Sequence, residues 1–266
     1  MIPLSVCLIA GNEAARIRPT LASVAGWTAE IVLVLNADVT DGTDKIAAEF
    51  GAKVFREPWK GFGPQKQSAA DKCTQPWLLN LDADEAVSPE LRAEITSLLA
   101  DETRARRHAA YSFPRCTFYS GRWIRHGNWY PDRQIRLWQR GQARWAEAQV
   151  HEKLEFNGTL GRLRGDLLHR SMDNLNHHVR KMIEYTDIAA RQQAGRKIGV
   201  FELAIRPWWR FMRSYWLRLG FLDGWQGYAV ARLAAQEAFL RYAKIREVQT
   251  AAEKSPGKSR SPFLVV

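Results

Sequence analysis

The sequence predicts an α/β fold: a doubly wound, mostly parallel sheet flanked by helices, followed by a C-terminal helical extension. Two observations in the first hundred residues predict the sheet, namely short continuous apolar runs and the helical segments that alternate with them. A long helical periodicity after residue 171 predicts the extension. The chain has 266 residues and 46% hydrophobic content, which is enough for a substantial core.

The elements of the first half follow from this alternation. Apolar runs predict strands over residues 4–10, 30–35 and 77–81, and a short strand is predicted over 52–56. Helices are predicted between and after them over 12–25, 40–50, 64–73 and 89–99, and Ser88-Pro89-Glu90 is a favourable start for the last. Shorter strands joined by Gly- and Arg-rich loops are predicted over 111–119, 134–138, 142–145 and 153–156.

The second half predicts a different organisation. Apolar residues at helical spacing predict a helix over 173–194 and a second helical region from 207 to 246. The end of the chain is polar and contains prolines, which is typical of a disordered tail. We therefore expect a first domain over 1–170, a helical extension over 171–248 and a disordered tail over 249–266.

The most informative segment is 77–85, an apolar strand that ends in three acids, Asp82, Asp84 and Glu85. The carboxyl ends of strands are where open α/β sheets bind their ligands. Two aspartates one residue apart can both bind a hard divalent cation, or one can bind the cation and the other a sugar hydroxyl. This pattern suits a protein that handles the diphosphate of a nucleotide-sugar. The alternative is a plain strand end that leads into the helix cap at Ser88.

Charge and cysteine content restrict the partners. The formal net charge is +11, and ten arginines but only one acid, Asp132, lie between Arg104 and Arg144. Such a field favours nucleic acid, phosphorylated glycan or an acidic membrane surface. Three widely spaced cysteines match no zinc pattern and indicate a reducing compartment. We expect a cytoplasmic protein, because no basic-then-apolar leader precedes the first strand and no run of 18 uncharged apolar residues occurs.

Several segments together resemble a known family. They are residues 5–13, 40–43, 58–66, 81–85, 121–132, 150–152 and 168–169, in this order. In these motifs the chain resembles glycosyltransferases of family 2, whose GT-A fold is Rossmann-like, and among them the lipopolysaccharide-core β-1,4-glucosyltransferases. The subgroup resemblance depends mainly on 58–66 and 121–132.

The resemblance implies a nucleotide-sugar site. It would involve residues at the ends of the first, second and fourth strands and in the helix after the Gly-rich turn: Ala10, Asn12, Glu13, Asn36, Asp38, Lys66, Asp82, Ala83 and Asp84. Asn12 and Glu13 would contact the nucleobase, or else only cap the following helix. Lys66 would meet the base or diphosphate, with a solvated surface lysine as the alternative. Asp82 would hydrogen-bond ribose.

The chain departs from the family pattern after the second strand. Asn36 occupies the position where the family has an acid that contacts the nucleobase, and Asp38 follows two positions later. An amide supplies both a donor and an acceptor, so Asn36 can still pair with the edge of uracil. Altered nucleotide preference is the other consequence to expect.

The resemblance also implies the chemistry. In an inverting transfer, one carboxylate takes the proton of the acceptor hydroxyl, and Glu152 is the candidate. Asp132 is the reserve candidate, unless it only forms a salt bridge with Arg133 or Arg136. A divalent metal, Mg²⁺ or Mn²⁺, would be bound by Asp84 and His169. Neighbouring His151 would orient the base or contact phosphate.

Tryptophans interleave with the arginines of 115–144, at Trp123, Trp129, Trp138 and Trp145. Indoles stack on sugars and guanidinium groups bind phosphate, so we expect a phosphorylated or lipid-linked saccharide acceptor. The expected contacts to the acceptor and its phosphate are Arg122, Arg125, Arg133, Arg136 and His151. Single-stranded RNA is the rival ligand, but no RNA-binding motif accompanies the pattern, and we expect no nucleic-acid partner.

The segment 206–218 predicts an amphipathic basic helix. Trp208, Phe211, Met212, Tyr215 and Leu219 share one helical stripe, with Arg206, Arg210 and Arg213 largely opposite. This pattern is typical of binding to an anionic membrane surface, here the inner face of the inner membrane. The alternative is that the stripe packs on the domain or on a second subunit of a homo-oligomer.

We therefore expect an inverting, metal-dependent hexosyltransferase that moves glucose from UDP to a lipopolysaccharide-core or related lipid-linked saccharide. One alternative is a transferase that acts on polyprenyl-phosphate or exopolysaccharide intermediates. The other is a non-catalytic module that binds nucleotide or glycan.

Overall fold

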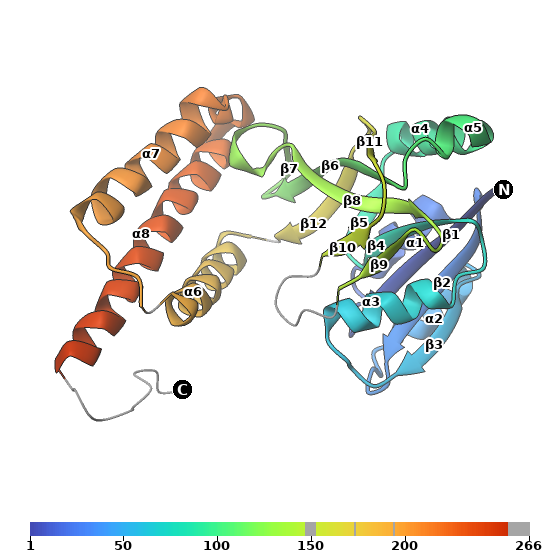
Figure 1. Ribbon diagram of the computed structural model, residues 1–266, viewed down its shortest axis with the longest axis horizontal. Helices are drawn as coiled ribbons and strands as arrows, with labels where there is room; N and C mark the ends of the chain where they lie inside the picture. Colours follow the sequence, from blue (N-terminus) through green and yellow to red (C-terminus); the bar gives the residue numbers. More distant parts are fainter. Residues whose placement is uncertain (147–152, 173, 194, 255–266) are drawn as a thin grey trace. The chain divides into compact units, whose positions relative to one another are not determined.

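The computed structural model describes residues 1–146, 153–172, 174–193 and 195–254 (Figure 1). The chain divides into two compact units. Unit 1 comprises residues Met1–Cys116 and Asp132–Ser171, and unit 2 comprises Thr117–Pro131 and Met172–Val266. The expected boundary after residue 170 differs from this division, because the hairpin segment 117–131 belongs to unit 2.

The α/β class and the four predicted parallel strands are confirmed. The strands are β1 (Ile2–Ala10), β2 (Thr28–Asn36), β3 (Lys53–Glu57) and β4 (Trp77–Asp82), in the spatial order β3-β2-β1-β4. Every pair among them is parallel. Parallel neighbours bring the carboxyl ends of β1, β2 and β4 to the same edge of the sheet. The residues that follow these strands can therefore form one site.

Most of the remaining strand pairs of the sheet are antiparallel, and one short strand, Leu160–Arg162, pairs in parallel. Beyond β4 the order continues as β8 (Asp132–Gln139), β6 (Ala110–Tyr119), β12 (Leu167–Met172) and β5 (Glu85–Val87). Two short strands, β7 (Arg122–Ile124) and β11 (Leu160–Arg162), also pair with β6. A separate hairpin is formed by β9 (Ala143–Trp145) and β10 (Leu154–Phe156). The sequence did not predict β5, β7, β11 or β12, which are short and depend on distant partners.

Helices cover both faces of the parallel strands. They are α1 (Ile17–Val24), α2 (Thr43–Glu49), α3 (Phe62–Asp71), α4 (Pro89–Ala100) and the short α5 (Glu102–Ala105). Along β1 the side chains alternate: Leu4, Val6 and Leu8 belong to the core cluster of α1 and α4. Cys7 and Ile9 belong to the opposite cluster, which includes residues of α3. Successive side chains that point into two different buried clusters are typical of a strand covered on both faces.

The first helix starts later than the sequence predicts. Arg16 and Ile17 donate their backbone N–H groups to the carbonyl of Glu13, so that a turn precedes the helix. Asn12 therefore does not cap α1, and residues 11–14 form a loop at the end of β1. The predicted start of α4 is confirmed, since the Ser88 hydroxyl accepts the N–H of Leu91.

Unit 2 is helical apart from its β-hairpin segment. It contains α6 (Leu175–Gln192), a π-helical turn over Phe201–Ile205, α7 (Arg206–Met212), a second π-helical turn over Arg213–Leu217 and α8 (Gly224–Lys254). Helix α8 packs against both α6 and α7. The helical region expected from 207 to 246 is interrupted after Leu217. Helix α8 also continues past residue 249, where the tail was expected to begin. Among the described residues, the helices are all too short or too polar to cross a bilayer.

Candidate functional site

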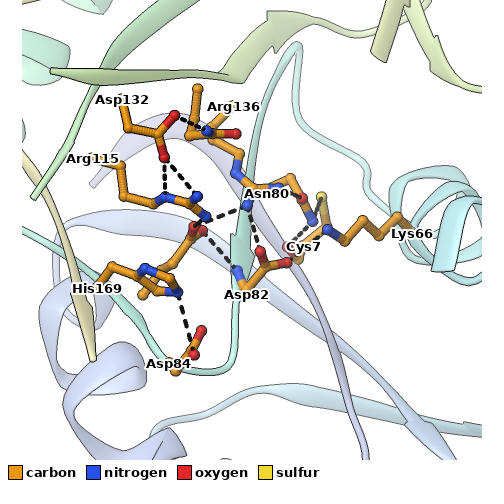
Figure 2. A network of polar contacts seen from close by, with 11 residues as sticks. Cys7, Lys66, Asn80, Asp82, Asp84, Arg115, Asp132, Arg136 and His169 are labelled. Atoms are coloured by element: carbon orange, nitrogen blue, oxygen red, sulfur yellow. Dashed lines mark hydrogen bonds and ion pairs between the residues drawn. The ribbon is translucent and has the colours of Figure 1, made fainter. Parts of the chain in front are cut away.

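The carboxylate of Asp82, the last residue of β4, is held between two cations (Figure 2). Oδ1 lies 2.7 Å from Nζ of Lys66, and Oδ2 forms an ion pair with the guanidinium of Arg136. Both cations are almost fully buried. Burial raises the pKa of Asp82, but the charges of Arg136 and Lys66 outweigh it and hold the pKa well below its usual range. Asp82 is therefore a fixed anion.

Arg136 in β8 connects Asp82 to the buried interior of the sheet. Its guanidinium donates to Oδ1 of Asn80 at 3.0 Å and to Oε1 of Glu85 at 2.9 Å. Asn80 in turn donates to the carbonyl of Cys7 in β1 at 2.9 Å. Burial lowers the pKa of Arg136, but Asp82 and Glu85 raise it further than burial lowers it. Both terminal nitrogens of Arg136 thus have internal partners, where the sequence led us to expect an acceptor phosphate, and its buried Nε has no hydrogen-bond partner among the described residues.

The polar network continues outward through Arg115 in β6. Arg115 lies 3.3 Å from Oε1 of the fully buried Glu85 and 2.6 Å from Oδ2 of Asp132. Asp132 also accepts a hydrogen bond from the amide of Gln134. The expected salt-bridge partners of Asp132, Arg133 and Arg136, are therefore wrong, and its partner is Arg115. The cross-strand register of β6 and β8 explains this, because Arg115 lies directly opposite Asp132.

Asp84 lies beside His169, with 3.4 Å between Oδ2 and Nε2 (Figure 2). The pairing of β5 with β12 brings the two residues together, since His169 is in register with Glu85. The backbone N–H of Arg170 also donates to the carbonyl of Asp84 at 3.0 Å. Burial raises the pKa of Asp84, but the hydrogen bond and charge of His169 lower it further. Asp84 is therefore an anion with an imidazole at its side.

This pair fits a hard divalent cation. Adjacent ligands of an octahedral ion with bonds of about 2.1 Å are roughly 3 Å apart, close to the separation of these two side chains. Both side chains remain partly exposed, at 23% for Asp84 and 12% for His169. No group of three or more metal-binding side chains occurs among the described residues. A cation here would take its other ligands from a bound diphosphate and water, as Mg²⁺ commonly does.

The loop after β1 is fixed by the loop after β2. The backbone N–H of Glu13 donates to the hydroxyl of Thr43 at 3.0 Å, and that of Ala14 donates to Asp41 at 2.9 Å. Thr43 donates its hydroxyl to the same Asp41 carboxylate. Burial raises the pKa of Glu13, the charge of Arg16 lowers it, and the charges of Asp84 and Asp41 raise it, with a net upward shift. The negative charges of Glu13 and Asp84 are therefore close enough to repel each other. Asn12, the preceding residue, is exposed.

Asn36 ends β2 with an unpaired group. Its Oδ1 atom is buried and accepts no hydrogen bond from the described residues. Its Nδ2 atom lies 3.7 Å from the point where a Cβ on Gly11 would be. A buried acceptor without a partner is uncommon in proteins and suits a ligand donor. Asp38 is exposed two residues later, and Ala10 is buried at the end of β1.

Lys66 does not lie on the surface as an isolated lysine would. It lies in the second turn of α3, is buried, and its Nζ is 5.0 Å from the ring centroid of Trp145. The side-chain oxygen of Gln67 accepts the backbone N–H of Trp145 at 2.8 Å. The tryptophan therefore closes over the lysine that neutralises Asp82. The alternative of a solvated lysine is wrong.

The arginines expected to bind the acceptor do not form one group within a unit. Arg122 and Arg125 belong to unit 2, and Arg133 and Arg136 belong to unit 1. Arg133 donates to the carbonyls of Ser112 and Leu163, at 2.6 and 2.8 Å. His151 and Glu152 lie outside the described residues. The acceptor and base assignments therefore remain predictions.

Sequence reasoning missed three members of the network. Glu85 was noted only as one of three acids, yet it is a buried counter-ion for two arginines. Arg115 was noted only as part of the basic span. Asn80 was not noted, although an amide inside an apolar strand is a signal of internal hydrogen bonding.

Comparisons with known proteins show the family to which the sequence is similar. The sequence model of Glycosyl transferase family 2 matches residues 5–154. The lipopolysaccharide core biosynthesis glycosyltransferase LpsC of Rhizobium meliloti is 34% identical over 253 residues, which are 92% of this chain and 92% of LpsC. An uncharacterized glycosyltransferase of Rickettsia typhi is 32% identical over 93% of this chain and 88% of its own length. A solved mannosyltransferase of Pyrobaculum calidifontis, in complex with GDP-Man and Mn²⁺, covers 96% of this chain and 76% of its own at 12% identity, with a TM-score of 0.49.

Proposed function

The chain belongs to glycosyl transferase family 2, and we propose that it transfers glucose from UDP-glucose to a lipopolysaccharide-core saccharide with inversion at the anomeric carbon. One observation carries this proposal. At the carboxyl end of β4, Asp82 is fixed by Lys66 and Arg136, while Asp84 lies beside His169. A nucleotide-sugar needs both of these carboxylates, one for the ribose and one for the cation on the diphosphate.

Asp82 is suited to the ribose. Lys66 and Arg136 fix both of its oxygens, but each carboxylate oxygen can accept more than one hydrogen bond, and the side chain remains 30% exposed. A ribose hydroxyl can therefore donate to a carboxylate that needs no reorientation. The paired cations also keep Asp82 from competing for the metal. This separation of roles between the two aspartates supports a nucleoside-diphosphate sugar as the donor.

Asp84 and His169 would hold a divalent cation, Mg²⁺ or Mn²⁺. When bound, the cation supplies positive charge to the diphosphate as it departs. Asn36 would accept the N3–H of uracil at its unpaired Oδ1. Glu13 and the loop held by Thr43 and Asp41 would form the side of the nucleobase site.

The transfer itself is a single displacement. The acceptor hydroxyl oxygen forms a bond to C1 of glucose while the bond from C1 to the β-phosphate oxygen breaks, and UDP leaves. The hydroxyl proton passes to the carboxylate of Glu152, which acts as general base. Asp132 is the reserve base, and its hydrogen bonds from Arg115 and Gln134 make it less available for this role.

The acceptor class is inferred from the relatives. The likeness to LpsC extends over 92% of both chains, which supports a lipopolysaccharide-core acceptor. Cys7, Cys73 and Cys116 are buried and form no disulfide with one another, which agrees with a reducing, cytoplasmic location. We propose that the protein acts at the cytoplasmic face of the inner membrane.

The proposal is tested by transfer assays with UDP-glucose, UDP-galactose and UDP-N-acetylglucosamine. The acceptor is core oligosaccharide, and each reaction is run with Mn²⁺ and with a chelator. We expect glucose transfer that requires the metal and is lost in Asp84→Asn. The matched control is Asp44→Asn, which removes the charge of a partly exposed aspartate paired with Arg56. Binding of UDP without transfer to any saccharide would favour the non-catalytic alternative. Transfer only to a polyprenyl-phosphate would refute the acceptor class.

A further inference from the structure

A turn in unit 2 exposes an unusual concentration of large apolar side chains. We define the hairpin tip as residues 215–225, where the chain turns from the π-helical segment Arg213–Leu217 into α8 (Figure 1). The exposed fraction of its large apolar side chains ranges from 39% for Phe221 to 65% for Leu217. These side chains are Trp216, Leu217, Leu219, Phe221, Leu222 and Trp225. Single exposed apolar residues are ordinary, but six within ten positions mark an interaction surface.

The hairpin tip is an ordered feature. Tyr215, Trp216 and Phe221 contact one another through their rings, with centroids 5.2 to 6.2 Å apart. The backbone turns at Leu219, which has a φ of +57°, a conformation that side chains other than glycine rarely adopt.

Close backbone packing holds the turn together. A Cβ on Gly227 would lie only 1.9 Å from the carbonyl oxygen of Gly220, and a Cβ on Gly220 would lie 2.7 Å from that of Ser214. These glycines allow the segments on either side of the turn to approach closely. The exposed rings are therefore presented by a rigid framework.

The charge around the hairpin tip has one sign at the surface. Residues 204–236 contain five arginines and one acid, Asp223. Asp223 is only 2% exposed and accepts the backbone N–H groups of Arg125 and His126, at 3.0 and 2.8 Å. Arg213 and Arg218 are exposed beside the rings. An apolar surface flanked by exposed arginines, with its only acid turned inward, is complementary to an anionic lipid interface.

This surface overlaps only in part with the stripe that the sequence indicated, since Leu219 belongs to both and Trp208 is exposed outside the tip. Phe211 and Tyr215 from that stripe are half-buried and contact Tyr228 of α8, with ring centroids 5.9 and 5.6 Å apart. For these two residues, the packing agrees with the alternative that the stripe packs on the domain. Other side chains, above all Leu217 and Trp225, provide the exposed apolar surface because the predicted helix breaks at Leu219.

We propose that the hairpin tip binds the headgroup region of an anionic phospholipid membrane, with Trp216, Leu217, Phe221 and Trp225 inserted and Arg213 and Arg218 at the phosphates. This role rests on the proposed function, since it would hold the transferase at a membrane that carries a lipid-linked acceptor. It can be measured without donor or acceptor, so its failure would leave the transfer proposal intact.

The test is co-sedimentation of the full chain with vesicles of phosphatidylcholine, or of equal parts phosphatidylcholine and phosphatidylglycerol. We expect binding to the mixed vesicles and a shift of tryptophan emission to shorter wavelength. Leu217→Ser/Trp225→Ser should lower the partition coefficient at least about tenfold. Arg213→Gln/Arg218→Gln should lower it roughly tenfold at low salt and little at high salt.

Matched controls come from exposed residues of the same unit outside the hairpin tip. Tyr185→Ser/Val200→Ser removes two apolar side chains that are 60% and 75% exposed, and Arg180→Gln/Lys197→Gln removes two positive charges. Each control should bind within about twofold of wild type. Absence of binding by wild type, or tip variants that bind like wild type, would overturn the proposal. So would a wild-type dimer that ignores vesicles and becomes monomeric in the tip variants, because the tip would then be covered by a second copy.

Discussion

The imidazole of His169 lies 3.4 Å from the carboxylate of Asp84, although the two residues come from distant parts of the chain. The antiparallel pairing of β5 with β12 produces this contact by placing His169 in register with Glu85. Asp82, two residues before Asp84, is instead taken up by Lys66 and Arg136. Two aspartates of one motif thus have different electrostatic partners, and only Asp84 is left for a cation.

The first prediction concerns the buried Glu85. Its carboxylate neutralises Arg136 and Arg115, so Glu85→Gln leaves two guanidinium groups with one carboxylate partner fewer. Breaking a buried ion pair on one side typically costs about 3 to 5 kcal/mol of unfolding free energy. We expect a loss of this order in urea unfolding. The control is Glu49→Gln in the exposed pair with Arg18, which should change stability little. Equal effects of the two substitutions would show that Glu85 has no structural role.

The second prediction concerns acid stability. Burial raises the pKa of Glu30, but hydrogen bonds from Lys53, Ser5 and Thr74 lower it further, to about 2 from 4.5. A carboxylate with a lowered folded pKa stabilises the fold above pH 4.5 and loses this contribution as the pH falls towards 2. The difference in unfolding free energy between wild type and Glu30→Gln should therefore shrink across that interval. If the difference in unfolding free energy stays constant from pH 6 to pH 2, the lowered pKa of Glu30 is contradicted.

The parallel half of the fold could be predicted because its signal is local. Strands β1, β2 and β4 contain long apolar runs, β3 is a shorter segment with Val54 and Phe55 at its centre, and the helix at Ser88 has its own capping residues. Strands β5 and β12 could not be predicted, since three to six residues without a periodic pattern become strands only by pairing with strands from other parts of the chain. The late start of α1 and the break at Leu219 likewise depend on tertiary contacts of the backbone.

The site residues could likewise be predicted where the signal is local, and not where it depends on strand pairing. The acids after β4 were predicted from their position, and Asn36 from the family pattern. The partners of Arg136 and Asp132 were not, because charge counting gives the excess of arginines but not the register that pairs them. Arg115 reaches Asp132 only because β6 and β8 are aligned residue by residue.

The third prediction concerns Asn36. Because its Oδ1 has no protein partner, Asn36→Ala should weaken UDP binding by about 2- to 10-fold and leave the unfolding free energy nearly unchanged. Fluorescence titration with UDP and thermal unfolding measure the two effects. Asn157→Ala, at an exposed position of unit 1, is the control amide deletion. Unchanged UDP affinity in Asn36→Ala would remove this residue from the nucleobase site.

The fourth prediction separates the two candidate bases. Glu152→Gln keeps the size of the side chain and removes its ability to take a proton. We expect kcat to fall by about 10²- to 10⁴-fold while the Kd for UDP is unchanged. Asp132→Asn should have a smaller effect on kcat, because Arg115 already occupies that carboxylate. Normal turnover in Glu152→Gln, together with an inactive Asp132→Asn, would transfer the role of base to Asp132.

The central claim is that Asp84, and not Asp82, binds the cation that coordinates the diphosphate of the donor. Calorimetric titration of UDP in the presence and absence of Mn²⁺ tests it most directly, with wild type, Asp84→Asn, His169→Ala and the control Asp44→Asn. We expect Mn²⁺ to strengthen UDP binding in wild type and in the control, and this gain to fall by about a hundredfold in Asp84→Asn. An undiminished gain from Mn²⁺ in Asp84→Asn would contradict the account.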